Sequence, residues 1–363
     1  MGGFSVIMAN KDLKNAVKAK NDEFYTQITD IEKECSNYME HFRGKTIFCN
    51  CDDPYESNFF KYFALNFGFL GIKKLIATCY AGSSIANKEL SLFDDENAEN
   101  KTTRMPHKIE ICEIPDINQD GAIDLTDVKL LLSSDKNHLT RLKGNGDFRS
   151  QECIEILKEA DVVVTNPPFS LFREYIAQLV EYKKSFLIIG NTNALTYKDV
   201  FKLIKENELS TGMTNFNIGM YFIVPDTWEK FHKIENGKKL VRNSNSCWFT
   251  NLDHKKRHEK LILYKNYSAT EYPKYDNYDA IEVSAYKDIP KDYDGLMGVP
   301  ITFVDKYNPD QFEIIGLAND KREKDDAFIQ AEPYNLDEQH KNFVGFVLNG
   351  KATYARIVIK RKK

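Results

Sequence analysis

Residues 161–169 have the sequence DVVVTNPPF, and this stretch indicates the fold more clearly than any other part of the chain. Three consecutive valines are typical of a strand that is buried on both faces. The two prolines end that strand, because proline has no backbone N–H and holds φ at about −65°. Ligands of open α/β sheets bind where the strands end, so we expect Asn166 and the residues after it to line a functional site.

The segments around this strand alternate short apolar runs with amphipathic stretches of helical length, which predicts an α/β fold with a mostly parallel sheet. We expect strands at residues 46–50, 74–79, 108–113, 161–165 and 186–190, and helices at residues 58–69, 150–159 and 172–182. Beyond residue 225, short alternating runs predict a smaller β-rich lobe, with strands at 246–251, 301–304 and 312–317. The expected domains are therefore residues 1–225 and 226–363.

The composition is that of a folded protein: 42% of the 363 residues are hydrophobic and 29% are charged. The sequence contains neither a secretion signal at its start nor an apolar run of about 20 residues, so we expect a cytoplasmic location. Seven cysteines without the paired spacing of zinc sites indicate reduced thiols, and we expect no metal site. The net charge of −4 leaves a nucleic-acid partner open.

The residues after the valine-rich strand suit chemistry on an exocyclic amine, which is a poor nucleophile because its lone pair is delocalised into the ring. The side-chain oxygen of Asn166 and the carbonyl of Pro167 offer two acceptors that would hold both amine hydrogens. Pro168 stiffens this turn, and Phe169 offers a flat face on which an extruded base stacks. The alternative is a proline-rich turn with a buried phenylalanine.

The tetrad Asn166, Pro167, Pro168 and Phe169 resembles the catalytic motif of amino-methyltransferases, which is Asn or Asp, two prolines and an aromatic residue. Nearly the whole chain is similar to the EcoRI-type adenine-specific DNA methyltransferases. The segments that carry this similarity are 21–27 (NDEFYTQ), 48–54 (FCNCDDP), 57–63 (SNFFKYF), 298–303 (GVPITF) and 307–312 (YNPDQF).

The resemblance implies a Rossmann-like class I sheet that uses S-adenosylmethionine as methyl donor, in residues 1–225. It implies methylation of the N6 amine of a flipped adenine in double-stranded DNA, with a target-recognition lobe in residues 226–363. Such an enzyme acts either in a restriction-modification pair with a cognate restriction endonuclease or as an orphan methylase.

The resemblance also implies a donor site. Phe24, Tyr25 and Thr26 would close over the methionine end of the donor, or form an aromatic plug against the sheet. Asn50, Asp52 and Asp53, with Pro54 after them, offer acceptors for its ammonium group, or serve as caps and turns. Tyr80, Asp147 and Phe148 would contact its adenine, although Asp147 is also typical of an ordinary turn.

Two features depart from the usual donor site. Glu56, Ser57 and Asn58 stand where a Gly-x-Gly turn is normal, and no acidic residue follows the second strand. A DNA-binding relative that has lost donor binding therefore stays open as an alternative. A protein-glutamine or RNA methyltransferase is a second alternative. Phe169 argues against it, because the motif of the glutamine-modifying enzymes resembles this one but has tyrosine at that position.

Aromatic and basic residues beyond residue 225 are candidates for DNA contacts or for a solvated surface. They are Trp248, Phe249, residues 254–258 (HKKRH) and the tail 356–363 (RIVIKRKK). Residues 116–127 (DINQDGAIDLTD) match a calcium-binding EF-hand loop at several positions, but end in Asp rather than Glu. The alternative there is a polar turn followed by a helix at 127–133.

Overall fold

The computed structural model describes residues 25–51, 57–79, 106–120, 123–124, 126–128, 130, 139–224, 228–320, 325–338 and 340–362. They form a mixed α/β fold with several sheets. The chain divides into two compact units, of which unit 1 comprises Met1–Asn191 with Thr214–Leu252, and unit 2 comprises Thr192–Met213 with Asp253–Lys363. Among the described residues, no helix combines the length and the apolar character that a membrane span requires.

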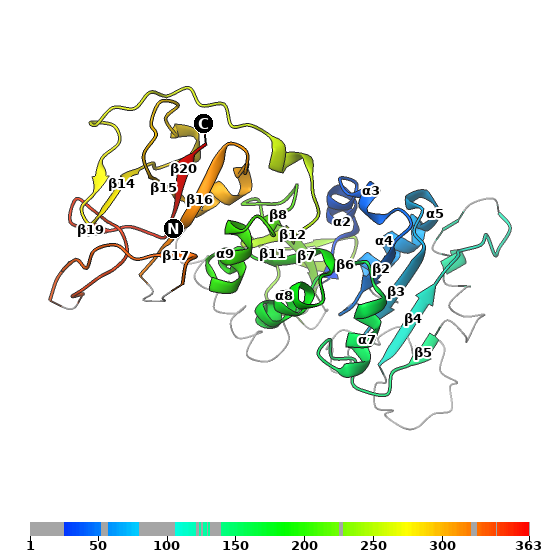
Figure 1. The fold of residues 1–363 in the computed structure, drawn as a ribbon. Helices are drawn as coiled ribbons and strands as arrows, with labels where there is room; N and C mark the ends of the chain where they lie inside the picture. The colour runs from blue at the N-terminus through cyan, green and yellow to red at the C-terminus, as the bar shows by residue number, and fades with distance from the viewer. Residues whose placement is uncertain are drawn as a thin grey trace. The chain divides into compact units, whose positions relative to one another are not determined.

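Unit 1 is built on one large sheet in which strands neighbour one another in the order β5-β4-β3-β2-β6-β7-β12 (Figure 1). Strands β3, β2, β6 and β7 are mutually parallel, whereas β4, β5 and β12 pair antiparallel with their neighbours. The bounds are β2 (Thr46–Cys49), β3 (Lys74–Thr78), β4 (His107–Ile111), β5 (Leu139–Arg141), β6 (Val162–Thr165), β7 (Ser185–Asn191) and β12 (Ser246–Thr250). Every residue of β2, β6 and β12 is buried, as strands covered on both faces require.

Helices cover both faces of this sheet, with α2, α4 and α5 on one side and α7 and α8 on the other (Figure 1). Their bounds are α2 (Ile28–Cys35), α3 (Met39–Phe42), α4 (Asn58–Leu65), α5 (Phe67–Leu70), α7 (Gln151–Glu159) and α8 (Phe172–Glu181), and a short 3-10 helix, η2 (Phe169–Leu171), precedes α8. Ser57 and Ser150 cap α4 and α7 by accepting backbone N–H groups. The single helix expected at residues 58–69 is instead two, because the chain leaves helical geometry at Asn66.

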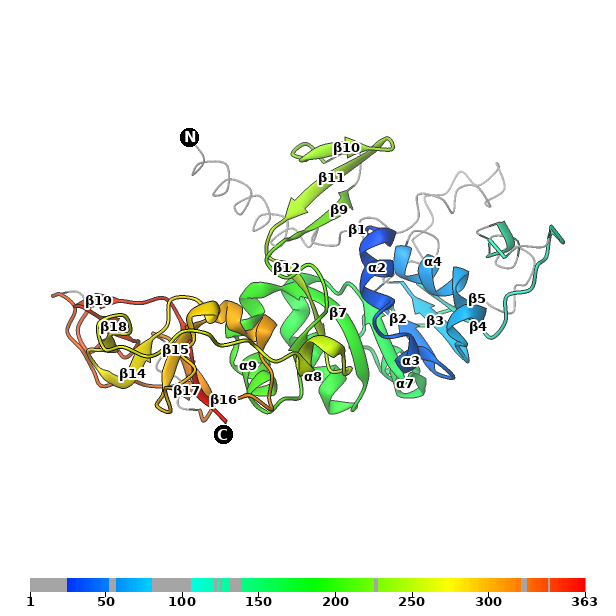
Figure 2. The same ribbon diagram turned by 90° about the horizontal axis from the view of Figure 1, so that it is seen from above.

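A second sheet of unit 1 has the order β1-β9-β11-β10 and extends away from the large sheet (Figure 2). It comprises β1 (Tyr25–Thr26), β9 (Met220–Val224), β10 (Lys233–Glu235) and β11 (Lys238–Asn243). Strands β10 and β11 form a hairpin whose turn residues, Asn236 and Gly237, both have positive φ angles, of 50° and 74°. An Asn-Gly pair favours this turn because both positions need the left-handed region.

Unit 2 contains a six-stranded sheet in the order β13-β14-β15-β20-β16-β17. Its strands are β13 (Lys274–Tyr275), β14 (Tyr278–Glu282), β15 (Met297–Pro300), β16 (Phe312–Ala318), β17 (Phe328–Ile329) and β20 (Arg356–Arg361). The other elements are η3 (Thr192–Thr196), α9 (Lys198–Lys205), β8 (Ser210–Thr211), η4 (Lys255–His258), η5 (Tyr286–Asp288), η6 (Ile301–Lys306), β18 (Val347–Leu348) and β19 (Lys351–Ala352).

One predicted strand of unit 2 is wrong, because residues 301–304 belong to the 3-10 helix η6. Pro300 ends β15, has a φ of −59° and stands at the N-cap of η6. Its ring fixes a φ that suits the start of a helical turn. Phe303 and Val304 are buried from that turn, so their hydrophobicity reports burial rather than an extended strand.

The sequence is not divided between the two units at a single position after residue 225, because each unit comprises two separate segments of the chain. Strand β11 pairs with β9, and β12 pairs with β7, so these later strands belong with unit 1. Conversely, α9 belongs with unit 2 although it precedes them in sequence. Strand pairing over long sequence distances produces this division, which composition cannot reveal. The assignment of target recognition to residues 226–363 stays a prediction.

Candidate active site

The tetrad stands directly after β6, at the edge of the sheet where the parallel strands end. Asn166, Pro168 and Phe169 are half-buried, and Pro167 is buried. The carbonyl of Pro168 accepts the backbone N–H of Leu171 at 3.0 Å, which closes the turn into η2. The chain therefore passes from strand to helix within three residues, and the tetrad lies in that tight connection.

Asn50, at the end of the neighbouring strand β2, is tied to the tetrad's strand. The Thr165 hydroxyl donates to the Asn50 carbonyl, and the Tyr175 hydroxyl donates to the Asn50 side-chain oxygen. Asn50 and Tyr175 are 2% and 0% exposed. The first of these buried hydrogen bonds fixes the end of β2 against Thr165, which precedes Asn166, and the second ties the Asn50 side chain to α8. The Asn50 oxygen expected to accept an ammonium group already accepts a protein hydroxyl.

The turn that contains Gly146 lies against the end of β3. Gly146 has a φ of +76°, and a Cβ at this position would stand 2.1 Å from the carbonyl oxygen of Cys79. Only glycine tolerates both this φ and this close approach. The turn is therefore held at the same sheet edge as Asn50 and Asn166.

Asp147 and Phe148 follow that glycine, and their side chains make different kinds of contact. The Phe148 ring is buried and meets the Tyr175 ring edge-on, at a centroid distance of 5.0 Å. The Asp147 carboxylate forms an ion pair with Arg149 at 2.7 Å and also accepts its backbone N–H at 2.9 Å. This carboxylate, together with that of Glu174, raises the pKa of Arg149. Both residues lie near the sheet edge, and Asp147 has the turn contacts that the alternative interpretation expected.

Tyr25 and Thr26 form β1 and reach the tetrad through β9. Thr26 pairs with Phe222, and the Phe222 ring meets the Phe169 ring edge-on, with centroids 6.3 Å apart. The side-chain amide of Asn58 donates to the Thr26 carbonyl at 2.7 Å. Asn58, which stands where a glycine was expected, thereby joins the start of α4 to the proposed donor-closing segment.

The remaining predicted site residues lie outside the described residues. They are Phe24, Asp52, Asp53, Pro54 and Tyr80. Tyr25 and Thr26, in the second sheet, reach the tetrad through Phe222, and the other seven described positions lie where strands of the large sheet end. Nine of the fourteen predicted positions are thus described. They are Tyr25, Thr26, Asn50, Asp147, Phe148, Asn166, Pro167, Pro168 and Phe169.

Three residues of this edge had no strong signal in the sequence. Tyr175 lies in the helix after the tetrad, and only its position within an amphipathic run marked it as buried. Phe222 depends on a pairing between strands almost 200 residues apart in sequence. Asn58 could have been noticed as a polar residue at the first position of an otherwise apolar helix.

Two expected DNA contacts are wrong. Trp248 and Phe249 are both 0% exposed. They lie in β12, where the Trp248 ring packs against Phe59 and the Phe249 ring packs against Phe172. A strand covered on both faces buries consecutive side chains, so these aromatic residues are part of the core of unit 1.

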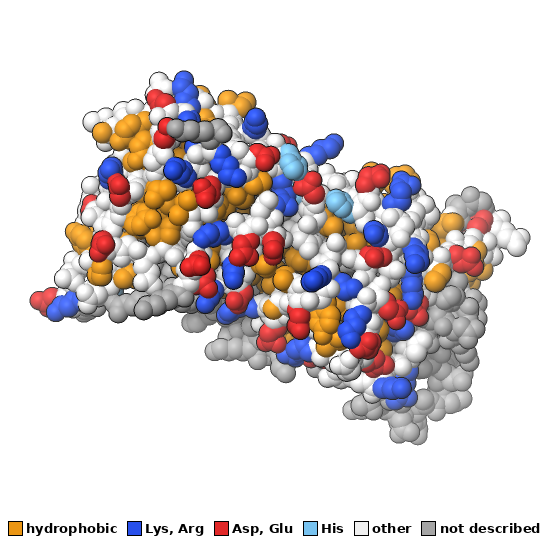
Figure 3. All heavy atoms as spheres, viewed as in Figure 1, with side chains coloured by type: hydrophobic (Ala, Val, Ile, Leu, Met, Phe, Trp, Pro, Cys, Tyr) orange, Lys and Arg blue, Asp and Glu red, His pale blue; other side chains and the backbone are white. Residues whose placement is uncertain are grey.

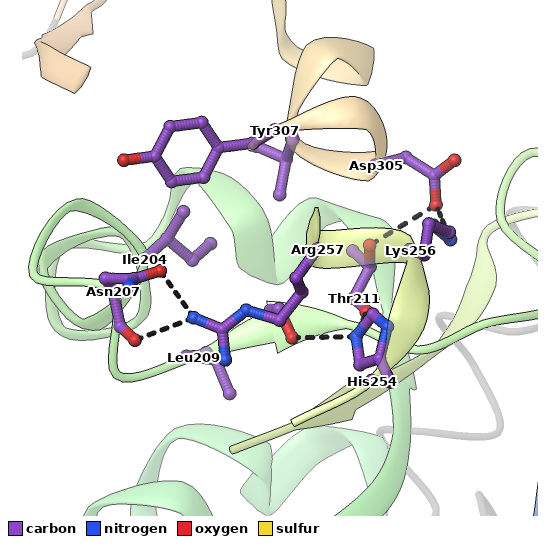
Figure 4. A pocket seen from close by; sticks show the side chains of 11 residues that line it. Ile204, Asn207, Leu209, Thr211, His254, Lys256, Arg257, Asp305 and Tyr307 are labelled. Carbon is purple, nitrogen blue, oxygen red and sulfur yellow. Dashed lines mark hydrogen bonds and ion pairs between the residues drawn. The ribbon is translucent and has the colours of Figure 1, made fainter. Parts of the chain in front are cut away.

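In the basic cluster at residues 254–258, His254 and Lys256 are buried within unit 2 (Figure 4), whereas Lys255 and His258 are exposed. The Lys256 ammonium is 9% exposed, pairs with Asp305 and donates to the Gly212 carbonyl at 2.6 Å. His254 is 5% exposed, and burial, with the nearby charges of Lys256 and Arg257, lowers its pKa to about 4. These two side chains are therefore not placed to contact phosphate.

The basic tail is strand β20, which pairs with β15 and β16 at the centre of its sheet. Residues Ile357, Val358 and Ile359 are 0% exposed, and Arg356 forms an ion pair with Glu282 at 2.8 Å. Only the end of the tail, at Lys360 and Lys362, is exposed among its described residues.

The EF-hand-like loop is described except for Gly121, Ala122 and Leu125. The carboxylate of Asp127 accepts the backbone N–H groups of Asp124 at 3.0 Å and of Ile117 at 2.8 Å. These bonds hold the pKa of Asp127 below its usual value. The side chain at the last position of the motif thus has the turn-forming contacts of the alternative interpretation. The described residues contain no group of three or more potential metal ligands.

Comparison with known proteins identifies the family. Residues 12–362 match the family described as "Adenine-specific methyltransferase EcoRI". The chain belongs to this family. The resemblance expected from the sequence is confirmed, and the EcoRI-family protein is an adenine-specific methyltransferase.

Named relatives of this family member match nearly its whole length. It is 46% identical to Type II methyltransferase M.EcoRI of Escherichia coli, over 98% of this chain and 97% of the relative. It is 38% identical to Type II methyltransferase M.MgeORF184P of Mycoplasma genitalium, over 96% and 98%, and 36% identical to M.MpnI of Mycoplasma pneumoniae, over 96% and 97%. No solved structure matches the chain significantly.

Proposed function

We propose that the protein transfers a methyl group from S-adenosylmethionine to the exocyclic N6 amine of an adenine that is flipped out of double-stranded DNA. The observation that carries this proposal is the position of Asn166–Phe169 after a buried strand, beside the ends of two parallel neighbours. This is where ligands of open α/β sheets bind. The large sheet would then be the Rossmann-like class I methyltransferase sheet, with catalysis in residues 1–225 and target recognition in residues 226–363.

The tetrad would act by orienting the amine rather than by removing its proton beforehand. The Asn166 side-chain oxygen and the Pro167 carbonyl would accept the two amine hydrogens and direct the nitrogen lone pair toward the methyl group. Phe169 would stack on the extruded adenine, which offsets part of the few kcal/mol lost on unstacking. The edge-on contact of Phe222 supports this role, because it fixes the plane of the Phe169 ring.

The donor site would lie along the same edge. S-adenosylmethionine, when bound, supplies an electrophilic methyl group on a sulfonium. The polar and aromatic groups present fit such a molecule: Tyr25 and Thr26 would cover its methionine end, and Asn50, whose side-chain oxygen also accepts the Tyr175 hydroxyl, would contact its amino-acid group. Asp147 and Phe148 would lie beside its adenine. Phe24, Asp52, Asp53, Pro54 and Tyr80 are proposed to complete this site.

The mechanism predicts a specific loss in the variant Asn166→Ala. We expect kcat for methyl transfer to fall at least about 10²- to 10³-fold, as when one preorganised transition-state contact is removed. Affinity for S-adenosylmethionine, measured by calorimetry, should stay close to that of the unmodified protein, because Asn166 contacts the base and not the donor. Asn37→Ala, at an exposed asparagine after α2, is the control. Unchanged turnover in Asn166→Ala would refute the mechanism.

We further propose that the enzyme is the modification half of a Type II restriction-modification system, as the names of its relatives suggest. Mapping N6-methyladenine in DNA from cells that express the protein would reveal its recognition sequence. DNA modified in this way should resist the cognate endonuclease. Absence of any methylated adenine in that DNA would overturn the proposed function.

A further inference from the structure

The hairpin of β10 and β11 in unit 1 is exposed in a way that its own packing does not explain. Residues 229–238 are all exposed, and among the described residues strand β10 pairs only with β11, at the edge of its sheet. Ile234, in the middle of β10, is 59% exposed, and Phe231 just before it is 40% exposed. Figure 2 shows these strands extending from the body of unit 1. An apolar side chain at such a position suits contact with a partner.

The charge of this hairpin differs from that of the chain. Residues 228–243 contain five lysines and arginines but only two glutamates, a net charge of +3, whereas the whole chain has a net charge of −4. On the face of the molecule drawn in Figure 3, acidic and basic side chains are interspersed. A local positive excess on an exposed hairpin is complementary to the phosphates of DNA.

The hairpin and a residue that contacts the tetrad share one face of the small sheet. In the register of the small sheet, Phe222 is opposite Val241, Val224 is opposite Lys239, and Lys239 is opposite Ile234. Side chains alternate between the faces of a strand, so these residues share one face of the sheet. That face begins at the contact of Phe222 with Phe169 and ends at the exposed Ile234.

The dimensions suit a DNA duplex. Lys239 is two residues from Val241 along β11, about 7 Å at the usual rise of a strand. A base stacked on Phe169 leaves its duplex close to the tetrad, and a major groove about 12 Å wide admits a two-stranded β-ribbon. The outer part of the hairpin is therefore within reach of the base pairs that flank the flipped adenine.

We propose that the hairpin of β10 and β11 enters a groove of double-stranded DNA beside the flipped adenine. Lys238, beside the turn and on the opposite face of the hairpin from Ile234, contacts backbone phosphate at the wall of that groove, and Ile234 contacts base edges. This inference rests on the proposed function and assigns DNA recognition to an element of unit 1. The competing explanation is that the lysines only protect an exposed sheet edge from pairing with other chains.

Salt-dependent DNA binding tests the phosphate contact. Fluorescence anisotropy would measure affinity for a duplex carrying the mapped recognition sequence, at several salt concentrations. Each lost phosphate contact lowers the slope of log affinity against log salt by about 0.9. For Lys238→Ala we therefore expect the loss of affinity between about 50 and 200 mM salt to be about 3-fold smaller than in the unmodified protein. The control is Lys73→Ala, at an exposed lysine before β3, which should keep the full slope.

Sequence discrimination tests the contact of Ile234. In Ile234→Ser we expect the ratio of kcat/KM between the recognition sequence and a duplex with one altered base pair to fall at least about 5-fold, the lower end of the range for a single base pair. Ile123→Ser, at another exposed isoleucine of unit 1, should leave that ratio unchanged. Affinity for S-adenosylmethionine should be unaltered in both variants.

The outcomes separate this inference from the proposed function. An unchanged salt slope in Lys238→Ala together with unchanged discrimination in Ile234→Ser would overturn the hairpin's role while leaving the tetrad's mechanism intact. A changed slope with unchanged discrimination would overturn the base contact and support phosphate binding alone. If the unmodified protein bound no DNA and methylated no adenine in it, the proposed function itself would fail.

Discussion

Two polar clusters of this protein differ in what their side chains contact. At the sheet edge of unit 1, Asn50 and Asn166 follow buried strands, and Asn166 is half-buried rather than enclosed. In the unit 2 cluster of Figure 4, Lys256 and Asp305 are 9% and 11% exposed and pair with each other. His254 in that cluster is held neutral at physiological pH, since its pKa is lowered to about 4.

The difference shows why residue type alone does not locate a site. A lysine and a histidine in a basic run indicated DNA binding, yet within unit 2 the Lys256 ammonium donates to the Gly212 carbonyl and His254 Nε2 lies 3.0 Å from the Thr211 carbonyl oxygen. Buried charges that pair with one another are not available to a ligand, so such a pair has a structural role. The asparagines at the sheet edge instead follow strand ends, where Asn50 is held by Thr165 and Tyr175 and three of the four tetrad residues are half-buried.

Breaking the ion pair of the unit 2 cluster should have the largest effect. In Asp305→Asn the Lys256 ammonium stays buried without its counter-charge, and we expect the free energy of unfolding to fall by about 3 to 5 kcal/mol. Urea denaturation would measure it. Asp294→Asn is the control, because Asp294 is 59% exposed and meets Arg361 only at 3.4 Å; we expect a loss below about 1 kcal/mol there. Equal losses in the two variants would remove the distinction between buried and exposed pairs.

The same cluster predicts a pH dependence of stability. The pKa of His254 is about 4 in the folded chain, below the ordinary value of 6.5. The unfolded chain therefore binds more protons between these values, so the stability from this group is complete above pH 6.5 and is lost as the pH falls toward 4. The full effect is about 3 kcal/mol. His254→Gln, which cannot titrate, should lose this part of the slope in denaturation series. A variant with the unmodified slope would show that His254 is not the group responsible.

Substitution of Gly146 should disturb the sheet edge of unit 1. In Gly146→Ala the new Cβ would meet the Cys79 carbonyl at a position with φ +76°, and we expect a loss of about 2 kcal/mol. Affinity for S-adenosylmethionine should fall with it, because the turn carrying Asp147 and Phe148 must move. Gly144→Ala meets no atom closer than 3.7 Å and should be nearly neutral in both measurements. Normal donor affinity in a destabilised Gly146→Ala would separate this turn from the donor site.

The smallest change is the removal of one oxygen in Tyr175→Phe. It deletes the hydrogen bond to Asn50 while keeping the ring contact with Phe148, and we expect a loss of about 1 kcal/mol in stability. If Tyr175 positions Asn50 for the donor, KM for S-adenosylmethionine should rise while kcat changes little. Tyr182→Phe, just after the same helix, is the control. A change in stability without any change in KM would leave Tyr175 a purely structural residue.

Much of unit 1 was predictable because local patterns and tertiary packing agree there. The strand before Asn166 was marked by its valines and prolines, and Ser57 and Ser150 marked the starts of two helices. The run at residues 301–304 misled because an apolar stretch reports burial, and a 3-10 helix after Pro300 buries it as well as a strand would. Trp248 and Phe249 misled because their exposure depends on which strands cover β12.

The sequence by itself determined the family, the tetrad and the ends of the strands that carry most of the candidate site. These are local properties: backbone restriction by proline, capping by serine and the apolar runs of buried strands. Only the tertiary structure decided that β1 meets β9 beside Phe169, that Tyr175 holds Asn50, and that Lys256 is buried while the β10–β11 hairpin is exposed. Those facts depend on contacts between segments far apart in the chain, and such contacts are fixed by how whole elements pack rather than by any neighbouring residues.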